Sequence, residues 1–301
     1  MEIDELDGRG LLSIGIVNYN NKKELKNCLS SIEETIKDIQ KEVFVCDNNS
    51  SDGSADMVRK DFPDVNLIRN SKNLGLSKAI NIILKSIGGD YFLLLDSDTE
   101  LRHGAIQYLL KFLNNNPDVG IVGPRIYTHE GAIQESARRF PNFLNGLFGR
   151  RSLMTRIFPN NSISKRFLCI DYINATEPFE VDFVIAACIL TRKEVIDKVG
   201  VFDEDFFVYW SEVDWCRRVK SDKYKYRVFC VPSAKIIHYE RYKPWNWKKG
   251  SPRMIKDFNK GAYLYYRKHH VKNRFSLKNL MAISMLSLRT GILLCVNHFK
   301  R

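Results

Sequence analysis

The sequence predicts an α/β fold with a mostly parallel central sheet that is flanked by helices. Strand-like apolar segments alternate with helix-like segments from Leu11 to Val122, and this order is typical of parallel strands joined by right-handed helical crossovers. The segment from Tyr91 to Leu95 is apolar at every position, which indicates a strand buried on both faces of the sheet. Polar residues directly follow several of these strands, and open α/β sheets bind ligands at the carboxyl ends of their strands.

The regular elements lie mainly in the first half of the chain. Residues 1–10 are acidic, lack an apolar signal region and are expected to form a loose tail. The expected helices carry apolar residues at helical spacing. Strands are expected at Leu11–Val17, Glu42–Cys46, Val65–Ile68, Tyr91–Leu95 and Val119–Val122. Helices are expected at Lys22–Thr35, Ser54–Phe62, Leu74–Ile87 and His103–Asn115.

The second half is less regular. Phe140–Glu180 is rich in Asn, Phe and Arg, and this composition favours either a solvated basic loop or a mobile loop that faces a substrate or a membrane. The elements expected after it are an apolar run at Val181–Leu190, helices at Arg192–Val199 and Ser211–Val219, and short strands at Tyr226–Val231 and Ala234–Ile237.

Composition limits the class of protein. The chain has 301 residues, enough for one large α/β domain with additions or for two small domains. Its net charge of +12 indicates polyanionic surroundings such as nucleic acid, anionic lipid or phosphorylated substrates. The seven cysteines are odd in number and form no Cys-x-x-Cys pair, so we expect reduced core cysteines in a cytosolic protein.

Two aspartates end the most apolar strand. Asp96 and Asp98 have only Ser97 between them, and such carboxylates are not core residues because unpaired buried charge is costly. Mg²⁺ and Mn²⁺ prefer hard oxygen ligands and often share their coordination shell with substrate phosphates. A metal site is therefore one interpretation, and a solvated turn with helix-capping aspartates is the other, since Asp-x-Asp is a common tripeptide.

Two further candidate groups lie in the second half. Glu212 and Asp214 stand at the start of an expected helix, where acids either favour the helix dipole or supply a catalytic base. Asp214 is also spaced to pair with Arg218 at i, i+4. His238 follows a short strand, and a lone histidine is more often structural. At the same edge of the sheet it would serve as a third metal ligand.

Six segments, in this order along the chain, resemble family 2 glycosyltransferases of the GT-A fold, most closely the bacterial rhamnosyltransferase-like branch. The resemblance extends from about Leu11 to about His270. These segments are Ser13–Asn20, Val45–Ser54, Asn73–Asn81, Leu95–Asp98, Gly200–Arg217 and Val231–His238. The family usually shows Glu-Asp-x-Asp where this chain has Ser211-Glu-Val-Asp214, and often Gly-Ala where it has Ala186-Ala187.

The resemblance implies a metal-dependent inverting glycosyltransferase of surface polysaccharide synthesis. The expected donor is dTDP-rhamnose, the expected acceptor is a glycan or a polyprenyl-linked sugar, and the expected cofactor is Mn²⁺ or Mg²⁺. In this family an aspartate like Asp47 hydrogen-bonds the pyrimidine base. The nucleotide-binding residues implied are Asn18, Asn20, Asp47, Asp52, Asn73, Lys78 and Asp96. Asp96, Asp98 and His238 would hold the metal, Glu212 or Asp214 would be the base, and Trp210 and Ala187 would contact the acceptor.

The resemblance also divides the chain. It implies a catalytic domain at 11–240, with a nucleotide-binding half at 11–122, an acceptor-binding half at 123–240, and a basic helical extension at 241–301. Within that extension Leu280 to Phe299 is largely apolar, but the central Arg289 opposes a membrane-spanning helix. We expect an interfacial helix on the cytosolic face of the plasma membrane. A helix that packs on the enzyme, or on a second subunit of a homodimer, is an equal alternative.

The sequence fits several other functions less well. The chain has no Gly-x-Gly-x-x-Gly after its first strand and no P-loop motif, which argues against a dinucleotide site and excludes a P-loop site. A haloacid-dehalogenase-type phosphatase requires Thr or Val at the position of Glu100. Transfer from another UDP-sugar stays open, because Asp47 would pair with uracil or thymine. A non-catalytic membrane- or nucleic-acid-binding scaffold is the remaining alternative, although no nucleic-acid recognition module is present.

Overall fold

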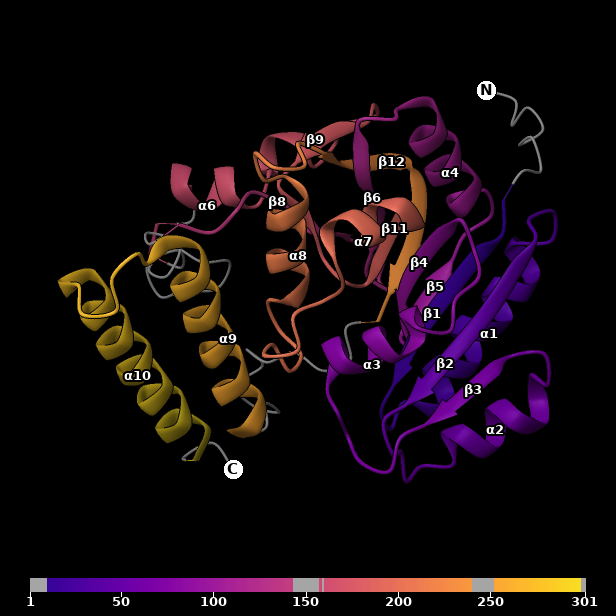
Figure 1. The fold of residues 1–301 in the computed structure, drawn as a ribbon, viewed down its shortest axis with the longest axis horizontal. Coiled ribbons are helices and arrows are strands. Elements are labelled where there is room, and N and C mark those ends of the chain that lie inside the picture. The colour runs from indigo at the N-terminus through magenta and orange to yellow at the C-terminus, as the bar shows by residue number, and fades with distance from the viewer. Residues whose placement is uncertain (1–9, 143–156, 159, 240–251, 299–301) are drawn as a thin grey trace.

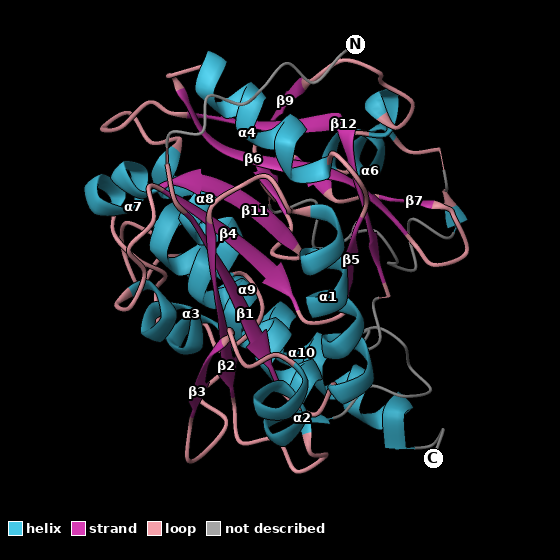
Figure 2. Ribbon diagram, turned by 90° about the vertical axis from the view of Figure 1, so that its right-hand side faces the viewer, coloured by secondary structure: helices cyan, strands magenta, loops and turns pink. Residues whose placement is uncertain are grey.

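The computed structural model describes residues 10–142, 157–158, 160–239 and 252–298. These residues form a ten-stranded sheet in the order β3-β2-β1-β4-β11-β6-β12-β5, with β7 beside β6 and β9 beside β12 (Figures 1 and 2). The strands are β1 (Leu12–Asn18), β2 (Lys41–Asp47), β3 (Asn66–Arg69), β4 (Tyr91–Asp96), β5 (Thr99–Leu101), β6 (Val119–Tyr127), β7 (Ile133–Gln134), β9 (Phe179–Val181), β11 (Cys188–Arg192) and β12 (Arg227–His238). A separate pair is formed by β8 (Ala137–Arg138) and β10 (Phe183–Val184).

Helices cover both faces of the sheet, as the sequence predicts. They are α1 (Lys22–Thr35), α2 (Ser54–Asp61), α3 (Leu76–Leu84), α4 (Ala105–Asn115), α6 (Ser162–Phe167), α7 (Lys193–Val199), α8 (Ser211–Val219), α9 (Pro252–His270) and α10 (Leu277–His298), with a 3-10 turn at Ile170–Tyr172. Buried residues of α1, α2 and α4 share one core, and those of α3, α7 and α8 share the other. In β4, Leu93 and Leu95 join the first core while Phe92 and Leu94 join the second, which confirms a strand buried on both faces.

The sheet is parallel in its first half and mixed in its second. Strands β3, β2, β1 and β4 pair in parallel, whereas β11 lies antiparallel between β4 and β6. The two short strands expected at Tyr226–Val231 and Ala234–Ile237 are one strand, β12. Its register shifts between Val231 and Lys235, around a proline that cannot donate to the ladder. The apolar run expected at Val181–Leu190 is divided among three short strands.

The loop between α7 and α8 is bound tightly to the start of α3. Leu76 N donates to Phe207 O at 2.5 Å, and Gly75 adopts a φ of +85°. A Cβ atom at Gly75 would lie 2.4 Å from Phe207 O, so only glycine allows this approach. The side chain of Asn81 donates to Phe202 O and accepts from Phe202 N. The loop that precedes α8 is therefore fastened to α3.

The C-terminal helices α9 and α10 form an antiparallel pair at the opposite end of the molecule from α1 and α2 (Figure 1). Among the described residues α10 alone is long and apolar enough to cross a membrane, and only 11% of its most apolar window is buried. The charge of Arg289 is turned toward α9: Nη1 donates to Asn259 Oδ1 at 2.5 Å, and the guanidinium lies 5.5 Å from the Phe258 ring. Arg289 is exposed in part, but its guanidinium is bound to α9.

Several sequence-based expectations concern residues that the structure leaves undescribed. The tail at 1–10 lies outside the described residues except for Gly10, and so do the basic residues Arg150, Arg151 and Arg156 of the irregular loop. The extension from 241 to 251 lies outside them as well. All seven cysteines are described; they are free, and six of them are buried, in agreement with the expected reduced core cysteines.

Candidate active site

The polar clusters that follow β1, β2 and β4 meet at one edge of the sheet. In the strand register Asn18 lies opposite Asp47, and Val17 lies opposite Asp96. Asn18 Nδ2 donates to Asp47 Oδ1 at 2.9 Å, and the second carboxylate oxygen of Asp47 accepts from Ser50 N. The predicted convergence at the carboxyl ends of the parallel strands is therefore confirmed.

The residues expected to bind the nucleotide differ in their surroundings. Asn18 and Asp47 are buried, at 0% and 1% exposure, so they form the floor of this edge. Asn20 ties the two loops together, because its Oδ1 accepts from Ser51 N at 2.8 Å. Asn73 Oδ1 accepts from Gly75 N and shapes the turn before α3.

Two of these residues have other partners. Asp52 links two helices: Oδ2 accepts from Lys22 N at the start of α1, and Oδ1 accepts from Ser54 N at the start of α2. Lys78 is exposed, and its Nζ lies 3.7 Å from the carboxylate of Glu204. The structure thus gives Asp52 a helix-capping contact and Lys78 a surface ion pair.

Asp96, Asp98 and His238 come together at the centre of the edge. His238 Nε2 lies 3.2 Å from Asp98 Oδ1 and 3.8 Å from Asp96 Oδ2, and one ligand atom from each residue lies within 4.8 Å of the others. The pairing of β12 with β5 brings about this contact, because His238 lies opposite Thr99. Ligands of Mn²⁺- or Mg²⁺-sized ions sit about 2.1 Å from the metal, so donor atoms spaced in this way fit a single divalent cation.

Neighbouring groups hold these three side chains. His238 Nδ1 lies 3.0 Å from Oε1 of the buried Gln134, a contact that favours a proton on Nδ1 and leaves Nε2 toward the aspartates. The backbone N–H of Asp96 donates to Ala187 O at 3.1 Å. Ala187, expected to contact the acceptor, is 1% exposed and supports Asp96 through its backbone.

The electrostatics of the cluster favour a cation. Burial, together with the nearby carboxylate of Asp98, raises the pKa of Asp96 to about 6, while His238 opposes the shift. Two carboxylates crowded in a buried site repel each other when both are ionised. A divalent ion would remove this repulsion, and two carboxylates with an imidazole are a ligand set that such ions accept.

The two acids of α8 have opposite environments. Glu212 is partly buried, and its pKa is raised to about 7, mainly by desolvation and in smaller part by the charge of Asp96. Hydrogen bonds from the backbone and the charge of Arg138 oppose this rise. Asp214 is fully buried and accepts from Arg218 Nε at 3.0 Å, as the spacing predicts. It also contacts Lys268 and His269 of α9. A pKa near 7 suits a general base at neutral pH, and an ion-paired carboxylate does not.

Trp210, the other residue expected to contact the acceptor, immediately precedes α8. Its backbone is left-handed, with φ at 78°, and its indole ring lies 5.5 Å from the ring of Tyr265 in α9. Its buried Nε1 has no hydrogen-bond partner among the described residues. Trp210 therefore packs against α9, and its unsatisfied N–H is compatible with a polar ligand.

Sequence reasoning missed Gln134, Lys268 and His269. Gln134 lies in a two-residue strand with no motif around it, so no local signal marks it. Lys268 and His269 lie in a basic run. Asp214 was the one signal for Lys268 and His269, because an acid that is buried at a helix start needs cationic or hydrogen-bonding partners from elsewhere in the chain.

Comparison with known proteins gives concordant results. The family model described as glycosyl transferase family 2 matches residues 13–200. The N-acetylglucosaminyl-diphospho-decaprenol L-rhamnosyltransferase of Mycobacterium tuberculosis is 26% identical over 246 residues, which is 77% of each chain. The dTDP-rhamnosyl transferase RfbF of Shigella flexneri is 27% identical over 229 residues, covering 74% of this chain and 67% of its own.

Solved structures agree on the fold. The mannosyltransferase PcManGT of Pyrobaculum calidifontis, in complex with GDP-Man and Mn²⁺, superposes with a TM-score of 0.59 at 17% identity, covering 97% of this chain and 74% of its own. GalNAc-T7, bound to UDP, GalNAc and Mn²⁺, gives a TM-score of 0.62 at 13% identity over 93% of this chain and 54% of its own. At these identities the likeness shows the fold alone, and it confirms the expected GT-A fold.

Proposed function

This chain belongs to glycosyl transferase family 2, and from that premise we propose that it is a metal-dependent inverting rhamnosyltransferase with a lipid-linked acceptor. Family membership and the relatives make it a glycosyltransferase of polysaccharide synthesis. The observation that carries the finer proposal is the convergence of Asp96, Asp98 and His238 at the sheet edge, with the charge of Asp96 acting on Glu212.

The proposed metal ligands are Asp96, Asp98 and His238. A divalent cation bound there would neutralise the charge that develops on the departing diphosphate. We favour Mn²⁺ over Mg²⁺ because imidazole is a poor ligand for Mg²⁺, and solved structures of this fold contain Mn²⁺. The protein holds the two carboxylates and Nε2 of His238 close enough together to bind one cation.

Glu212 is the proposed catalytic base. Its carboxylate takes the proton from an acceptor hydroxyl, whose oxygen then forms a bond to the anomeric carbon of the sugar. The bond from that carbon to the diphosphate breaks, and the diphosphate leaves with the electron pair. Attack from the face opposite the leaving group inverts the configuration. The nearby Arg138 opposes the rise in the pKa of Glu212, which keeps the base ionised in part at neutral pH.

The donor is proposed from the relatives and from the nucleotide-binding loops. Two rhamnosyltransferase relatives support dTDP-rhamnose, and Asp47 would accept from N3–H of thymine or uracil alike. A panel of dTDP- and UDP-sugars, assayed for Mn²⁺-dependent hydrolysis, tests this proposal. Turnover of dTDP-rhamnose in preference to the UDP-sugars is expected. Preference for a UDP-sugar would leave the proposed transferase activity in place and would contradict dTDP-rhamnose as the donor.

Replacement of Gln134 by leucine is expected to weaken Mn²⁺ binding. The carboxamide orients His238 through Nδ1, and loss of such an outer contact typically costs 10- to 100-fold in metal affinity. Mn²⁺ affinity is measured by electron paramagnetic resonance, independently of turnover. Gln107→Leu in α4 removes a bond to Thr35 O and serves as the matched control. Equal Mn²⁺ affinity in Gln134→Leu and the control would contradict the assigned contact.

The outward face of α10 is proposed to contact an anionic membrane surface. Leu277, Leu288 and Ile292 are exposed at 73%, 67% and 53%. No acidic residue follows Asp257 in the sequence, and exposed basic residues flank the start of the helix. An apolar face beside basic residues suits the headgroup region of an anionic bilayer. A lipid-linked acceptor, as in the mycobacterial relative, would be reached there.

The double substitution Leu288→Glu and Ile292→Glu is expected to lower vesicle binding by tenfold or more. Burial of each apolar side chain contributes about 2 kcal/mol, and each new carboxylate is repelled by anionic lipid. Co-sedimentation with vesicles of phosphatidylglycerol and phosphatidylcholine measures the effect. The pair Ser86→Glu and Asn115→Glu makes the same charge change on the catalytic domain. If the first variant loses only self-association, measured by sedimentation velocity, the face is a dimer interface instead.

A further inference from the structure

The latch is our name for a cluster of five ionisable residues, namely the buried Asp214 and its neighbours Asp203, Arg218, Lys268 and His269. Lys268 Nζ lies 2.9 Å and His269 Nε2 lies 2.7 Å from Asp214 Oδ1, while Arg218 Nε donates to Oδ2. Burial alone would raise the pKa of Asp214, but the bonds from His269 and Lys268 and the charge of Arg218 hold it at about 2. A carboxylate this weakly basic is a poor proton acceptor at neutral pH.

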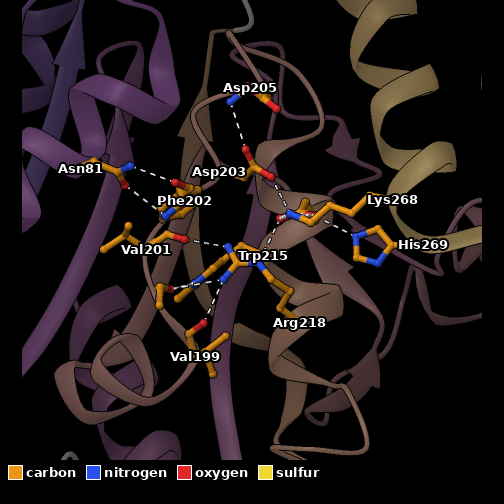
Figure 3. Close-up of polar contacts among 12 residues, drawn as sticks. Asn81, Val199, Val201, Phe202, Asp203, Asp205, Trp215, Arg218, Lys268 and His269 are labelled. Carbon is orange, nitrogen blue, oxygen red and sulfur yellow. Dashed lines mark hydrogen bonds and ion pairs between the residues drawn. The ribbon is translucent and has the colours of Figure 1, made fainter.

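The latch joins three segments of the chain, namely α8, the last turn of α9 and the loop between α7 and α8 (Figure 3). Lys268 and His269 lie in the last turn of α9. Lys268 Nζ also lies 2.5 Å from Asp203 Oδ2, in the loop between α7 and α8. Arg218 donates to the carbonyl oxygens at both ends of the 199–201 segment. The last turn of α9 is thus fastened to α8 and to the loop that precedes it.

A second contact holds the start of α8 against α9. The indole of Trp210 packs on Tyr265, and a Cβ atom at Gly261 of α9 would lie only 2.8 Å from that indole. Asp214 N donates to Trp210 O at 3.0 Å, which closes the first turn of α8. Glu212 lies inside this turn, so α9 contacts the residues on both sides of it.

We propose that Asp214 is a positioning residue, which fastens the last turn of α9 to the first turn of α8 through Lys268 and His269 and so fixes where Glu212 lies. The inference rests on the proposed role of Glu212 as the base. It separates the two acids that the sequence placed together as catalytic. It also makes the C-terminal hairpin a part of the catalytic machinery. Displacement of a reacting group by about 1 Å costs up to 100-fold in rate.

The test is the double variant Lys268→Gln and His269→Gln, with Lys256→Gln and His270→Gln on the same helix as the matched control. We expect kcat to fall about tenfold, because the base is misplaced in the reactive complex. The affinity for nucleotide with Mn²⁺ should stay within twofold, since the latch contains none of the proposed nucleotide-binding or metal-binding residues. The acid limb of the kcat profile should move below pH 7, because a looser α8 admits water to Glu212, which faces Arg138 and Asp96.

A folded double variant with the kcat and the acid limb of the wild type would overturn the proposed positioning role of Asp214. If the double variant does not fold, the single variant His269→Gln keeps the lysine contacts and should still lower kcat, while Lys268→Arg should preserve it by bridging both carboxylates. Equal kcat in His269→Gln and wild type would then refute the proposal. Loss of activity in Glu212→Gln together with normal latch variants would leave the proposed function intact. Full activity in Glu212→Gln would refute the base itself.

Discussion

Replacement of Asp98 by alanine is expected to lower kcat/KM for donor turnover by about 10³-fold, because metal assistance to a leaving group is worth several kcal/mol. Asp98 lies 3.2 Å from Nε2 of His238, so its loss removes one of the three proposed ligands. Mn²⁺ affinity should fall in the same variant. Donor hydrolysis and Mn²⁺ binding are measured side by side.

The matched control for this variant is Asp56→Ala, an aspartate of α2 whose side chain is 74% exposed. Surface ion pairs of this kind contribute about 1 kcal/mol or less, so near wild-type activity is expected. Full donor turnover in Asp98→Ala would contradict the metal site. A fall in turnover without a fall in Mn²⁺ affinity would assign Asp98 another role.

Replacement of Glu212 by glutamine is expected to lower kcat by 10²- to 10⁴-fold, the usual contribution of a general base. The amide keeps the shape of the side chain and cannot accept the proton. Donor affinity should change little. In the wild type kcat should rise with pH and level off above about 7, because the base works only when ionised. Glu194→Gln in α7 removes a surface carboxylate and should behave as wild type.

The same variant has a second expected effect, on stability. Burial raises the pKa of Glu212 in the folded chain from 4.5 to about 7, so the ionised carboxylate opposes folding. By linkage, stability is lost as the pH rises from the unfolded pKa through the folded pKa. Glu212→Gln should therefore melt at a higher temperature than wild type at pH 8, and the difference should vanish at pH 4. A lower melting temperature at pH 8 would contradict the raised pKa of Glu212.

The meeting of polar side chains at the ends of β1, β2 and β4 could be predicted because each strand and the polar residues after it are local in sequence. An apolar run that stops at Asp96 places that carboxylate at the end of a buried strand, and neighbouring parallel strands end at the same edge. The register of Asn18 opposite Asp47 follows from the same rule. Helix α1 begins and ends where its apolar spacing predicts, at Lys22 and Thr35.

Contacts between distant elements could not be predicted in this way. The two strands expected at Tyr226–Val231 and Ala234–Ile237 form one strand, β12, because both parts pair with β6 across a bulge and the second part also pairs with β5. Arg289 suggested an interrupted apolar helix, but its guanidinium donates a hydrogen bond to Oδ1 of Asn259 in α9. Likewise, the sequence does not separate Asp214 from Glu212 as the base, because the pKa of each acid depends on neighbours in space. For Asp214 these neighbours include Lys268 and His269 of α9.

The central claim is that the edge formed by β1, β2, β4 and β12 binds a nucleotide diphosphate together with a divalent cation. Calorimetric titration of the wild-type chain with dTDP and with UDP, in Mn²⁺ and in EDTA, tests it most directly. We expect binding in Mn²⁺ that becomes at least tenfold weaker in EDTA, because the diphosphate then meets Asp96 and Asp98 without a cation between them. Binding of equal strength in EDTA, or no binding of either nucleotide, would contradict the claim.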